Sequence, residues 1–279
     1  MALVERGLAA LVVTEPANVR YLTGYVGSNG VAVIGVNGRF LFTDSRYAVS
    51  ANEQVRGADV VIGTRDLLAD VAASATDVAG GGPIGVEADN LTLARHGRLT
   101  ELLGGLATEP TRGIVEDLRV IKDADEVAAM REAAAVVDRA LGRVLDAGIV
   151  GRTERAVAFS LLEAMLDEGA SDASFPAIVA SGPRGARPHH VPGPDPIPAD
   201  TLVVIDMGAV VDGYCSDMTR TVATGLLPGR LQEIYGLCLR ARARRGPGHP
   251  RAAGCAAGGD RGPRGGDGHH HRARHLPRG

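Results

Sequence analysis

One segment of this 279-residue chain constrains its fold more than any other. Residues 201–224, TLVVIDMGAVVDGYCSDMTRTVAT, contain two runs of β-capable residues on either side of Asp212 and Gly213. An Asp-Gly pair suits a type I′ turn, because both central residues of that turn need a positive φ. The segment therefore predicts an antiparallel β-hairpin.

The register of this hairpin brings two carboxylates together. With the turn at residues 212–213, Asp217 is expected opposite Gly208 and on the same sheet face as Asp206. Diagonal neighbours on one face lie about 7 Å apart at Cβ, and two like charges so placed repel each other unless cations neutralise them. A pair of divalent ions resolves the conflict, since hard cations favour carboxylate oxygens. The alternative, which the hairpin alone does not exclude, is that Asp206 only interrupts a strand and Asp217 is a solvated surface residue.

A histidine pair precedes the hairpin. Residues 174–182, SFPAIVASG, predict a strand that ends in a Gly-Pro turn, and Pro188 and Pro192 then bracket His189 and His190. Proline restricts its own backbone and that of the residue before it. An imidazole held in this way can face a substrate carbonyl or leaving group, although an ordinary loop histidine fits the pattern equally well.

The first 112 residues predict an α/β domain, because short β-capable runs alternate with a helical segment and turn residues. We expect strands at 8–14, 31–36, 40–43, 60–62 and 84–86, a helix at 47–55, and a hairpin turn at Asn37 and Gly38. Around residues 109–113 the polarity rises and the periodicity fades, which indicates a linker.

Residues 113–240 predict an α+β domain that begins with two helices. Residues 123–145 show apolar side chains at steps of three and four, the pattern of a long amphipathic helix: Val127, Met130, Ala134, Val137 and Leu141. A second helix is expected over 156–166, with Thr153 as its N-cap. The antiparallel hairpin follows these helices.

Residues 241–279 predict a disordered tail. This segment contains nine Arg, and Leu276 is its single large aliphatic residue, so it cannot bury a core. A nucleic-acid-binding tail would need aromatic residues for stacking, and His269, His270 and His271 lie in a Gly/Arg-rich stretch that cannot orient them for metal. We therefore expect no nucleic-acid partner. A frameshift or truncation explains the composition better, since Lys122 is the only lysine of the chain.

The beginning of the chain does not resemble a secretory signal, because Glu5 and Arg6 interrupt the first apolar residues. No run of about 18 apolar residues is present to span a bilayer. We expect a cytoplasmic protein without a membrane partner.

Three stretches of the sequence resemble one protein family. Residues 181–221, SGPRGARPHHVPGPDPIPADTLVVIDMGAVVDGYCSDMTRT, resemble the Xaa-Pro aminopeptidase and prolidase family of pita-bread metallopeptidases, in which a histidine-bearing loop precedes an aspartate hairpin of this spacing. ANVRYLTGYVGSNG and FLFTDSRYAVSANEQ resemble the creatinase/prolidase N-terminal domain, and LRVIKDADEVAAM resembles its connection into the catalytic domain. The likeness extends from about Leu8 to about Arg240.

The resemblance implies an α/β N-terminal domain over residues 1–112, an incomplete α+β pita-bread domain over 113–240 and the tail over 241–279. It also implies that Asp206 and Asp217 are metal ligands for two divalent ions (manganese, cobalt or zinc), and that His189 is the active-site histidine, with His190 as its neighbour. The substrate would be a proline-containing peptide or dipeptide. A homodimer is expected if the N-terminal domain serves for dimerisation.

The family completes its metal pair with a histidine and two glutamates, but no Glu follows Glu233 in this sequence. We therefore expect weak or absent metal binding and impaired or absent hydrolysis of Xaa-Pro bonds. Two alternatives stay open: a non-catalytic binding or dimerisation remnant, and a creatinase-like, metal-free hydrolase. In the second, Asp206 and Asp217 would have no evident task.

Overall fold

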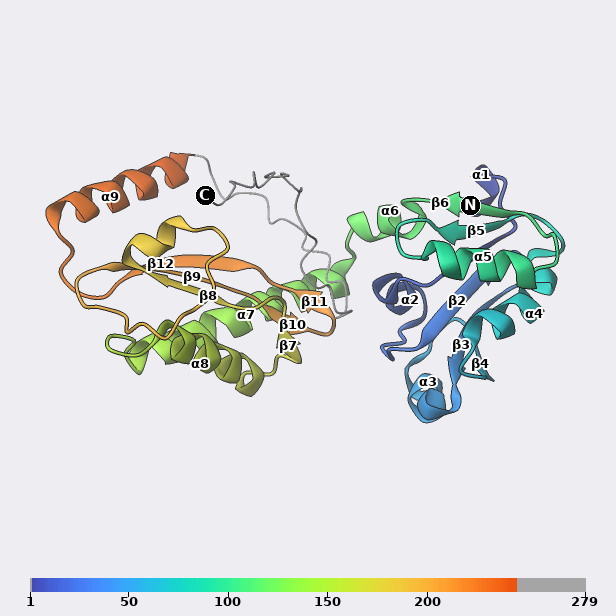
Figure 1. The fold of residues 1–279 in the computed structure, drawn as a ribbon, viewed down its shortest axis with the longest axis horizontal. Helices are drawn as coiled ribbons and strands as arrows, with labels where there is room; N and C mark the ends of the chain where they lie inside the picture. The colour runs from blue at the N-terminus through green and yellow to red at the C-terminus, as the bar shows by residue number, and fades with distance from the viewer. Residues whose placement is uncertain (1, 245–279) are drawn as a thin grey trace, which may run out of the picture.

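The fold is that of a computed structural model, which describes residues 2–244. Its strands form three sheets, and no sheet joins the first half of the described chain to the second. Figure 1 shows the two halves connected through helix α6 (Ile114–Val120) and the start of the long helix α7 (Ala124–Asp146). The predicted boundary at residues 112 and 113 stays a prediction, while the last strand of the first sheet ends at Thr111.

The first half is a six-stranded mixed sheet with the order β4-β3-β2-β1-β5-β6. β1, β2 and β3 pair antiparallel, and the other neighbours pair parallel. The strands are β1 (Ala10–Val13), β2 (Gly30–Gly35), β3 (Gly38–Asp44), β4 (Asp59–Gly63), β5 (Ile84–Glu87) and β6 (Thr108–Thr111). The helices are α1 (Ala2–Glu5), α2 (Pro16–Thr23), α3 (Ala48–Gln54), α4 (Leu67–Ala79), α5 (Leu93–Leu102) and the 3-10 turn η1 (Ser45–Tyr47).

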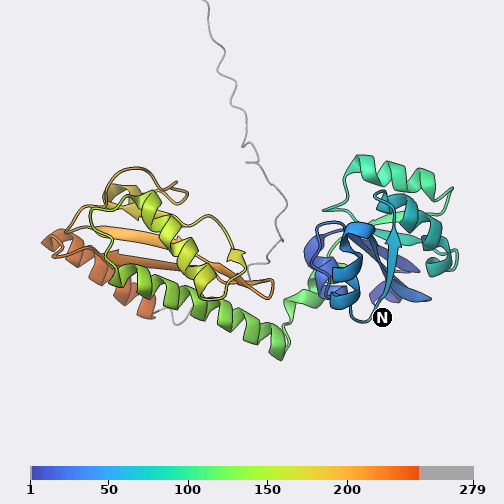
Figure 2. The same ribbon diagram turned by 90° about the horizontal axis from the view of Figure 1, so that it is seen from below.

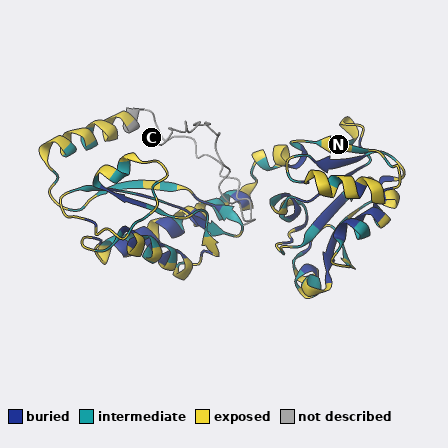
Figure 3. Cartoon of the chain, in the orientation of Figure 1, coloured by how far each residue is buried: buried dark blue, intermediate teal, exposed yellow. Residues whose placement is uncertain are grey.

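Both faces of this sheet are covered, as β1 illustrates. Val12 packs among residues of α4 and α5, whereas Leu11 and Val13 pack with residues of α2, α3 and α6. Because successive side chains of a strand point to opposite faces, a strand that is apolar throughout needs helices on both sides. Figure 3 shows these strands buried beneath helices whose outer faces are exposed. The predicted α/β class is confirmed.

The prediction of a linker at residues 109–113 is wrong for its first part. Residues 108–111 form the edge strand β6, which pairs with β5 alone. Pro110 argues against a strand in the sequence because proline has no N–H to donate. An edge strand tolerates proline, since one of its sides has no neighbouring strand.

A polar network fixes α6 against the first half. The Asn18 Nδ2 group donates to Glu87 Oε1 at 2.7 Å and to Glu116 Oε1 at 2.5 Å. Arg119, also on α6, donates to Asn18 Oδ1 at 2.8 Å. Asn18 is fully buried, so this network anchors the helix that leads into the second half.

The second half packs two helices against short antiparallel strands. α7 and α8 (Glu154–Asp167) lie on one side of the strands, and Figures 1 and 2 agree on this arrangement. The strands are β7 (Asp172–Ala173), β8 (Ile178–Ser181), β9 (Leu202–Met207), β10 (Ala209–Val211), β11 (Tyr214–Cys215) and β12 (Met218–Ala223), and the 3-10 turn η2 (Gly182–Ala186) follows β8. They form the sheets β12-β9-β8 and β11-β10-β7.

The two helices begin as their sequences predict. Asp123 and Glu126 form a capping box at the start of α7, and the Thr153 side chain caps α8 by accepting from the Ala156 N–H. One position of the predicted stripe on α7 is wrong, because Ala134 is exposed and Ala133 is buried in its place. A period of 3.6 residues leaves neighbouring positions at the edge of a stripe hard to separate.

The hairpin register is confirmed on both sides of the bend. Val211 pairs with Tyr214 next to the turn, and Met218 pairs with Met207 beyond it. Asp212 has φ 46° and Gly213 has φ 70°, the two positive values that a type I′ turn requires. Gly213 also allows a contact with the first half, since a Cβ there would lie 2.3 Å from Cζ of Arg20.

The hairpin bends at Gly208, between β9 and β10. A Cβ at this position would lie 2.0 Å from the Ser216 carbonyl oxygen and 2.1 Å from Ser174 Oγ. Ser174 Oγ donates to that carbonyl at 2.7 Å, and the Ser174 N–H donates to Gly208 O at 2.9 Å. The bend therefore depends on a residue without a side chain.

Helix α9 (Gly229–Arg244) ends the described chain. It extends four residues into the segment predicted as a disordered tail, so residues 241–244 are helical; the rest of the predicted tail, residues 245–279, lies outside the described residues. Figure 1 places α9 on the side of the strands opposite α7 and α8. Within residues 2–244, no helix is long and apolar enough to cross a membrane.

Replacement of Gly208 by alanine should destabilise the second half. The added methyl group meets backbone on one side and Ser174 on the other, so we expect a loss of about 1–3 kcal/mol in the free energy of unfolding. Gly142→Ala on α7 is the matched control, because nothing lies within 4 Å of its Cβ position, and it should be neutral or stabilising by up to about 1 kcal/mol. Urea unfolding of both variants tests this, and equal stabilities would show that the close approach at Gly208 is not a constraint.

Candidate metal centre and histidine loop

Asp206 lies on β9, the central strand of its sheet, on the face away from α7 and α8. Its neighbour Met207 is buried in the core with α7 and α8, and Met218, which pairs with Met207, packs against the same core. Asp206 and its partner Thr219 therefore point to the opposite face. Thr219 Oγ1 donates to Asp206 Oδ1 at 2.6 Å, which orients this carboxylate.

Asp217 directly precedes β12, and its side chain is exposed. The backbone beside it is fixed by Ser216, whose Oγ donates to Ala133 O on α7 at 2.9 Å and accepts from the Ala209 N–H at 3.0 Å. Since Met218 faces the core, the alternation of the strand directs Asp217 to the side of Asp206. We call Asp206 and Asp217 the aspartate pair.

The aspartate pair has no third partner of the expected kind in the described chain. Among residues 2–244, no group of three or more His, Cys, Asp or Glu side chains could hold a metal ion. The donors present there do not fit a complete two-metal centre, which would need further carboxylate and imidazole groups to balance the charge of two ions.

The two histidines have different environments. His189 is exposed, whereas the His190 side chain is only 8% exposed and its Nε2 lies 2.8 Å from Glu154 Oε2. Both belong to the segment between β8 and β9, and we call residues 182–195 the histidine loop. The sequence left open whether an imidazole is held in place or belongs to an ordinary loop, and the structure holds His190, the neighbour of the predicted His189, through Glu154.

Glu154 is the group that fixes this loop. Its carboxylate is fully buried at the first turn of α8. Oε1 accepts from the Ser181 N–H, Ser181 Oγ and Arg184 Nε, each at 2.8 Å, and Oε2 accepts from His190 and from the Gly193 N–H at 3.3 Å. Burial acts to raise the pKa of Glu154, but the bonds from His190, Ser181 and Gly193 outweigh it and lower the pKa to about 2.

Arg184 links the start of the histidine loop to its end. Besides Glu154, its guanidinium donates to Asp195 Oδ2 at 3.0 Å and to Ser181 Oγ at 2.9 Å. The planar guanidinium suits such simultaneous contacts. Both ends of the loop are thus tied to one buried carboxylate.

The histidine loop covers part of the face that bears Asp206. A Cβ at Gly185 would lie 3.1 Å from Cγ2 of Val204, and Val204 is two residues before Asp206 on β9. Residues two apart on a strand share a face. The loop therefore passes over the sheet on the side of the aspartate pair.

The sequence did not reveal Glu154, Arg184 or Thr219 as site residues. A signal for Glu154 was present, because it falls on the buried stripe of α8 together with Val157 and Leu161. A charged residue at a buried helical position needs partners. Nothing in the sequence indicates which donors these would be.

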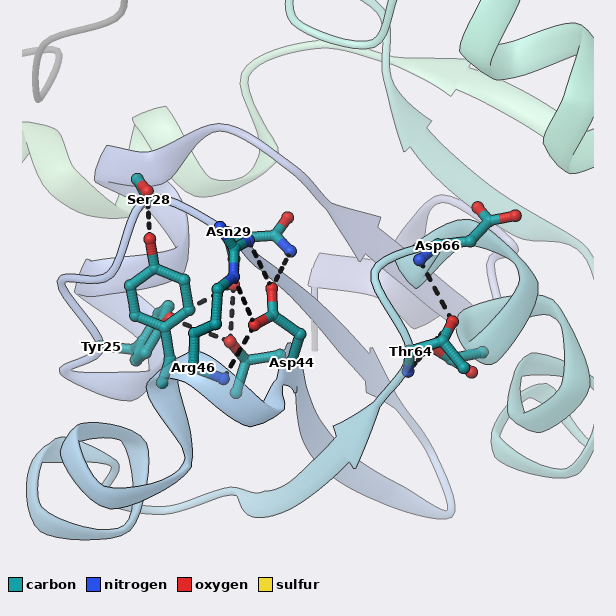
Figure 4. A network of polar contacts seen from close by, with 10 residues as sticks. Tyr25, Ser28, Asn29, Asp44, Arg46, Thr64 and Asp66 are labelled. Carbon is teal, nitrogen blue, oxygen red and sulfur yellow. Dashed lines mark hydrogen bonds and ion pairs between the residues drawn. The ribbon is translucent and has the colours of Figure 1, made fainter.

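A second polar network joins residues 17–30 to residues 40–54, the two segments that resemble the creatinase/prolidase N-terminal domain (Figure 4). The buried Asp44 carboxylate accepts from Asn29 Nδ2 at 2.6 Å and from Arg46 Nε at 2.9 Å. Hydrogen bonds from Arg46 and then Asn29 hold the pKa of Asp44 well below its usual range. Tyr25 extends the network, with its hydroxyl 2.9 Å from Thr43 Oγ1. None of these residues belongs to the aspartate pair or the histidine loop.

A cavity of about 650 Å³ lies between the two halves. Residues of α2, the start of α7 and the β10–β11 turn line it, but His189, Asp206 and Asp217 do not. At its edge the Tyr214 hydroxyl donates to Glu126 Oε1 at 2.9 Å, and burial, then this bond, raises the pKa of Tyr214 to about 12. The cavity is distinct from the candidate site.

Comparison with known proteins identifies the family of both halves. Residues 1–121 match the creatinase/prolidase N-terminal domain, and residues 128–245 match metallopeptidase family M24. The uncharacterized peptidase YqhT of Bacillus subtilis is 36% identical over 237 residues, which cover 85% of this chain and 67% of that protein. This chain belongs to the Xaa-Pro aminopeptidase and prolidase family of M24 metallopeptidases.

Solved members of the family have the same fold. The Xaa-Pro dipeptidase from Bacillus anthracis superposes with a TM-score of 0.83 at 34% identity, over 88% of this chain and 69% of that one. The X-Pro aminopeptidase from Thermotoga maritima gives 0.79 at 29% identity, over 86% and 70%. The chain thus spans about two thirds of the length of these M24 relatives.

Family membership confirms the predicted fold class, a creatinase-type N-terminal domain followed by part of a pita-bread domain. M24 is a family of divalent-metal-dependent peptidases. The roles of His189, Asp206 and Asp217 stay predictions, as does the cytoplasmic location.

The buried Glu154 predicts a specific dependence of stability on pH. Because its pKa is about 2 in the folded protein and about 4.3 in an unfolded chain, its contribution is complete above pH about 5 and is lost as the pH falls towards 2. The difference in free energy of unfolding between wild type and Glu154→Gln should therefore shrink over this interval.

Glu163→Gln provides the control for this prediction, since Glu163 is exposed on the same helix. Its difference from wild type should stay near zero throughout. Urea denaturation at several pH values measures all three proteins, and a Glu154→Gln difference that is constant from pH 5 to pH 2 would contradict the low pKa.

Proposed function

We propose that this chain contains part of the active site of a metal-dependent peptidase that hydrolyses the peptide bond preceding proline. Asp206 and Asp217 are the metal-binding carboxylates of that part, and His189 faces the substrate. The observation that carries the proposal is the hairpin register, which directs both aspartates to the sheet face over which the histidine loop passes.

The substrate class follows from the relatives. Similar proteins are named Xaa-Pro dipeptidase and X-Pro aminopeptidase, so the substrate is a dipeptide or a longer peptide with proline after the scissile bond. Hydrolysis adds water to the carbonyl carbon and breaks its bond to the proline nitrogen. The products are a free carboxylate and a peptide or amino acid with proline at its N-terminus.

Metal binding by the described residues should be weak. Two carboxylates can hold a divalent ion such as manganese, cobalt or zinc, but they leave most of its coordination positions to water. Residues 2–244 offer no group of three donors. We therefore propose that hydrolysis by these residues alone is near background.

The lack of a group of three metal donors among residues 2–244 also favours a second candidate, a non-catalytic binding or dimerisation module in the cytoplasm. In that case the first half forms a homodimer and the aspartate pair is a remnant. A creatinase-like, metal-free hydrolase is less favoured, because it gives the aspartate pair no task.

Metal affinity distinguishes these candidates. Calorimetric titration with manganese, cobalt or zinc should show one class of weak sites with a dissociation constant on the order of 0.1–1 mM. Asp217→Ala should abolish this binding, whereas Asp146→Ala, at the exposed end of α7, should not change it. Tight binding of two ions would contradict the proposal of an incomplete centre, and binding unaffected by Asp217→Ala would contradict the assignment of the site.

Activity is the second measurement. Hydrolysis of a proline-containing dipeptide and of a longer Xaa-Pro peptide should be near background with any of the three metals. Turnover that Asp217→Ala abolishes would mean that further ligands come from outside the described residues or from a second chain. That result would contradict weak activity while supporting the aspartate pair as metal ligands.

A further inference from the structure

The burial of the Glu154 carboxylate is explained better by the groups that it orients than by a gain in stability. Removing a carboxylate from water costs free energy, and well-packed apolar residues often stabilise a core as well as a buried ion pair does. Its side chain nevertheless lies fully buried on the inner face of α8. A buried charge of this kind is best explained by what it holds in place.

Every donor to this carboxylate belongs to the histidine loop or to the strand residue that leads into it. Ser181 ends β8, Arg184 lies in η2, and His190 and Gly193 follow the turn of the loop. The contacts therefore span the loop from its start to its end. A helix residue that only stabilised α8 would contact its own helix or the core.

The two adjacent histidines of the loop point in different directions. His190 is directed inwards to Glu154, and the adjacent His189 is exposed. Gly185 of the same loop packs against Val204, on the sheet face that bears Asp206. The contact between the His190 side chain and Glu154 therefore also fixes the backbone of the adjacent His189.

We propose that Glu154 is a positioning residue: its buried carboxylate ties both ends of the histidine loop and thereby holds His189 at the sheet face of the aspartate pair. The proposal rests on the proposed function in one respect, the assignment of His189 to the site. Glu154 itself acts through His190 and Arg184.

Backbone order at His189 tests this without any need for activity. In the wild-type chain the amide order parameter of His189, from nitrogen-15 relaxation, should be about 0.85, the value of rigid backbone. In Glu154→Gln one acceptor oxygen becomes an amide that faces existing donors, and the order parameter should fall below about 0.6. Glu163→Gln, on the exposed side of α8, should leave it unchanged.

Chemical labelling gives a second readout. Carbethoxylation of His190, located by tandem mass spectrometry, should become about tenfold faster or more in Glu154→Gln, because a charge-assisted hydrogen bond no longer protects the ring. The rate at the exposed His189 should change little. Order parameters of β9 and α7 should match those of the wild type.

Three results would overturn the proposal. They are an unchanged order parameter at His189, an unchanged labelling rate at His190, or an equal loss of order in the loop, β9 and α7, which would indicate general destabilisation. If Glu154→Gln does not fold, His190→Gln and Arg184→Gln remove the same contacts from the loop side. A rigid His189 in both variants would equally contradict the proposal.

The proposed function and this inference fail separately. Absence of metal binding or hydrolysis leaves the order of the loop untouched. A loop that stays rigid without Glu154 leaves the aspartate pair as metal ligands.

Discussion

The register of the hairpin that joins β9 to β12 is the constraint on which the candidate site depends. A shift of one residue would turn Asp206 towards the apolar core and Met207 towards solvent. Two local features prevent this shift: the left-handed turn at Asp212 and Gly213, and the bend at Gly208, where Ser174 and Ser216 hold the strands together. The positions of both aspartates thus follow from backbone geometry, whether or not a metal ion is bound.

The histidine loop depends on a different kind of interaction. Its residues have little apolar surface to bury, so packing alone cannot give it one conformation. A single charged group inside the protein supplies the order instead, because each loop donor that leaves Glu154 removes a hydrogen bond from a buried charge. The hairpin and the loop meet on one sheet face, and α7 and α8 pack against the other face of the hairpin. The aspartate pair and the loop therefore lie on one face of the sheet, and Glu154 contacts the loop from α8.

The sequence predicts those parts of this arrangement that local chemistry determines. The Asp-Gly turn fixes the register, Thr153 fixes the start of α8, and the alternation of β-capable runs with a helical segment and turn residues gives the α/β class of the first half. It fails where tertiary context decides. Pro110 lies in an edge strand that the sequence predicts as a linker. On α7, Ala133 is buried where the sequence predicts Ala134. The Glu154 network joins residues that are 27 to 39 positions apart. No periodicity in the sequence contains the information that Ser181, His190 and Gly193 converge on one carboxylate.

The central claim is that the aspartate pair is a preformed but incomplete metal site. Titration of the nitrogen-15-labelled chain with small amounts of manganese, followed by paramagnetic broadening of its amide resonances, tests it most directly. The account predicts that residues 205–207 and 217–219 broaden first, that a large excess of manganese is needed to saturate the effect, and that Asp217→Ala removes it. Broadening centred elsewhere in the chain, or saturation at two equivalents of manganese, would contradict the account.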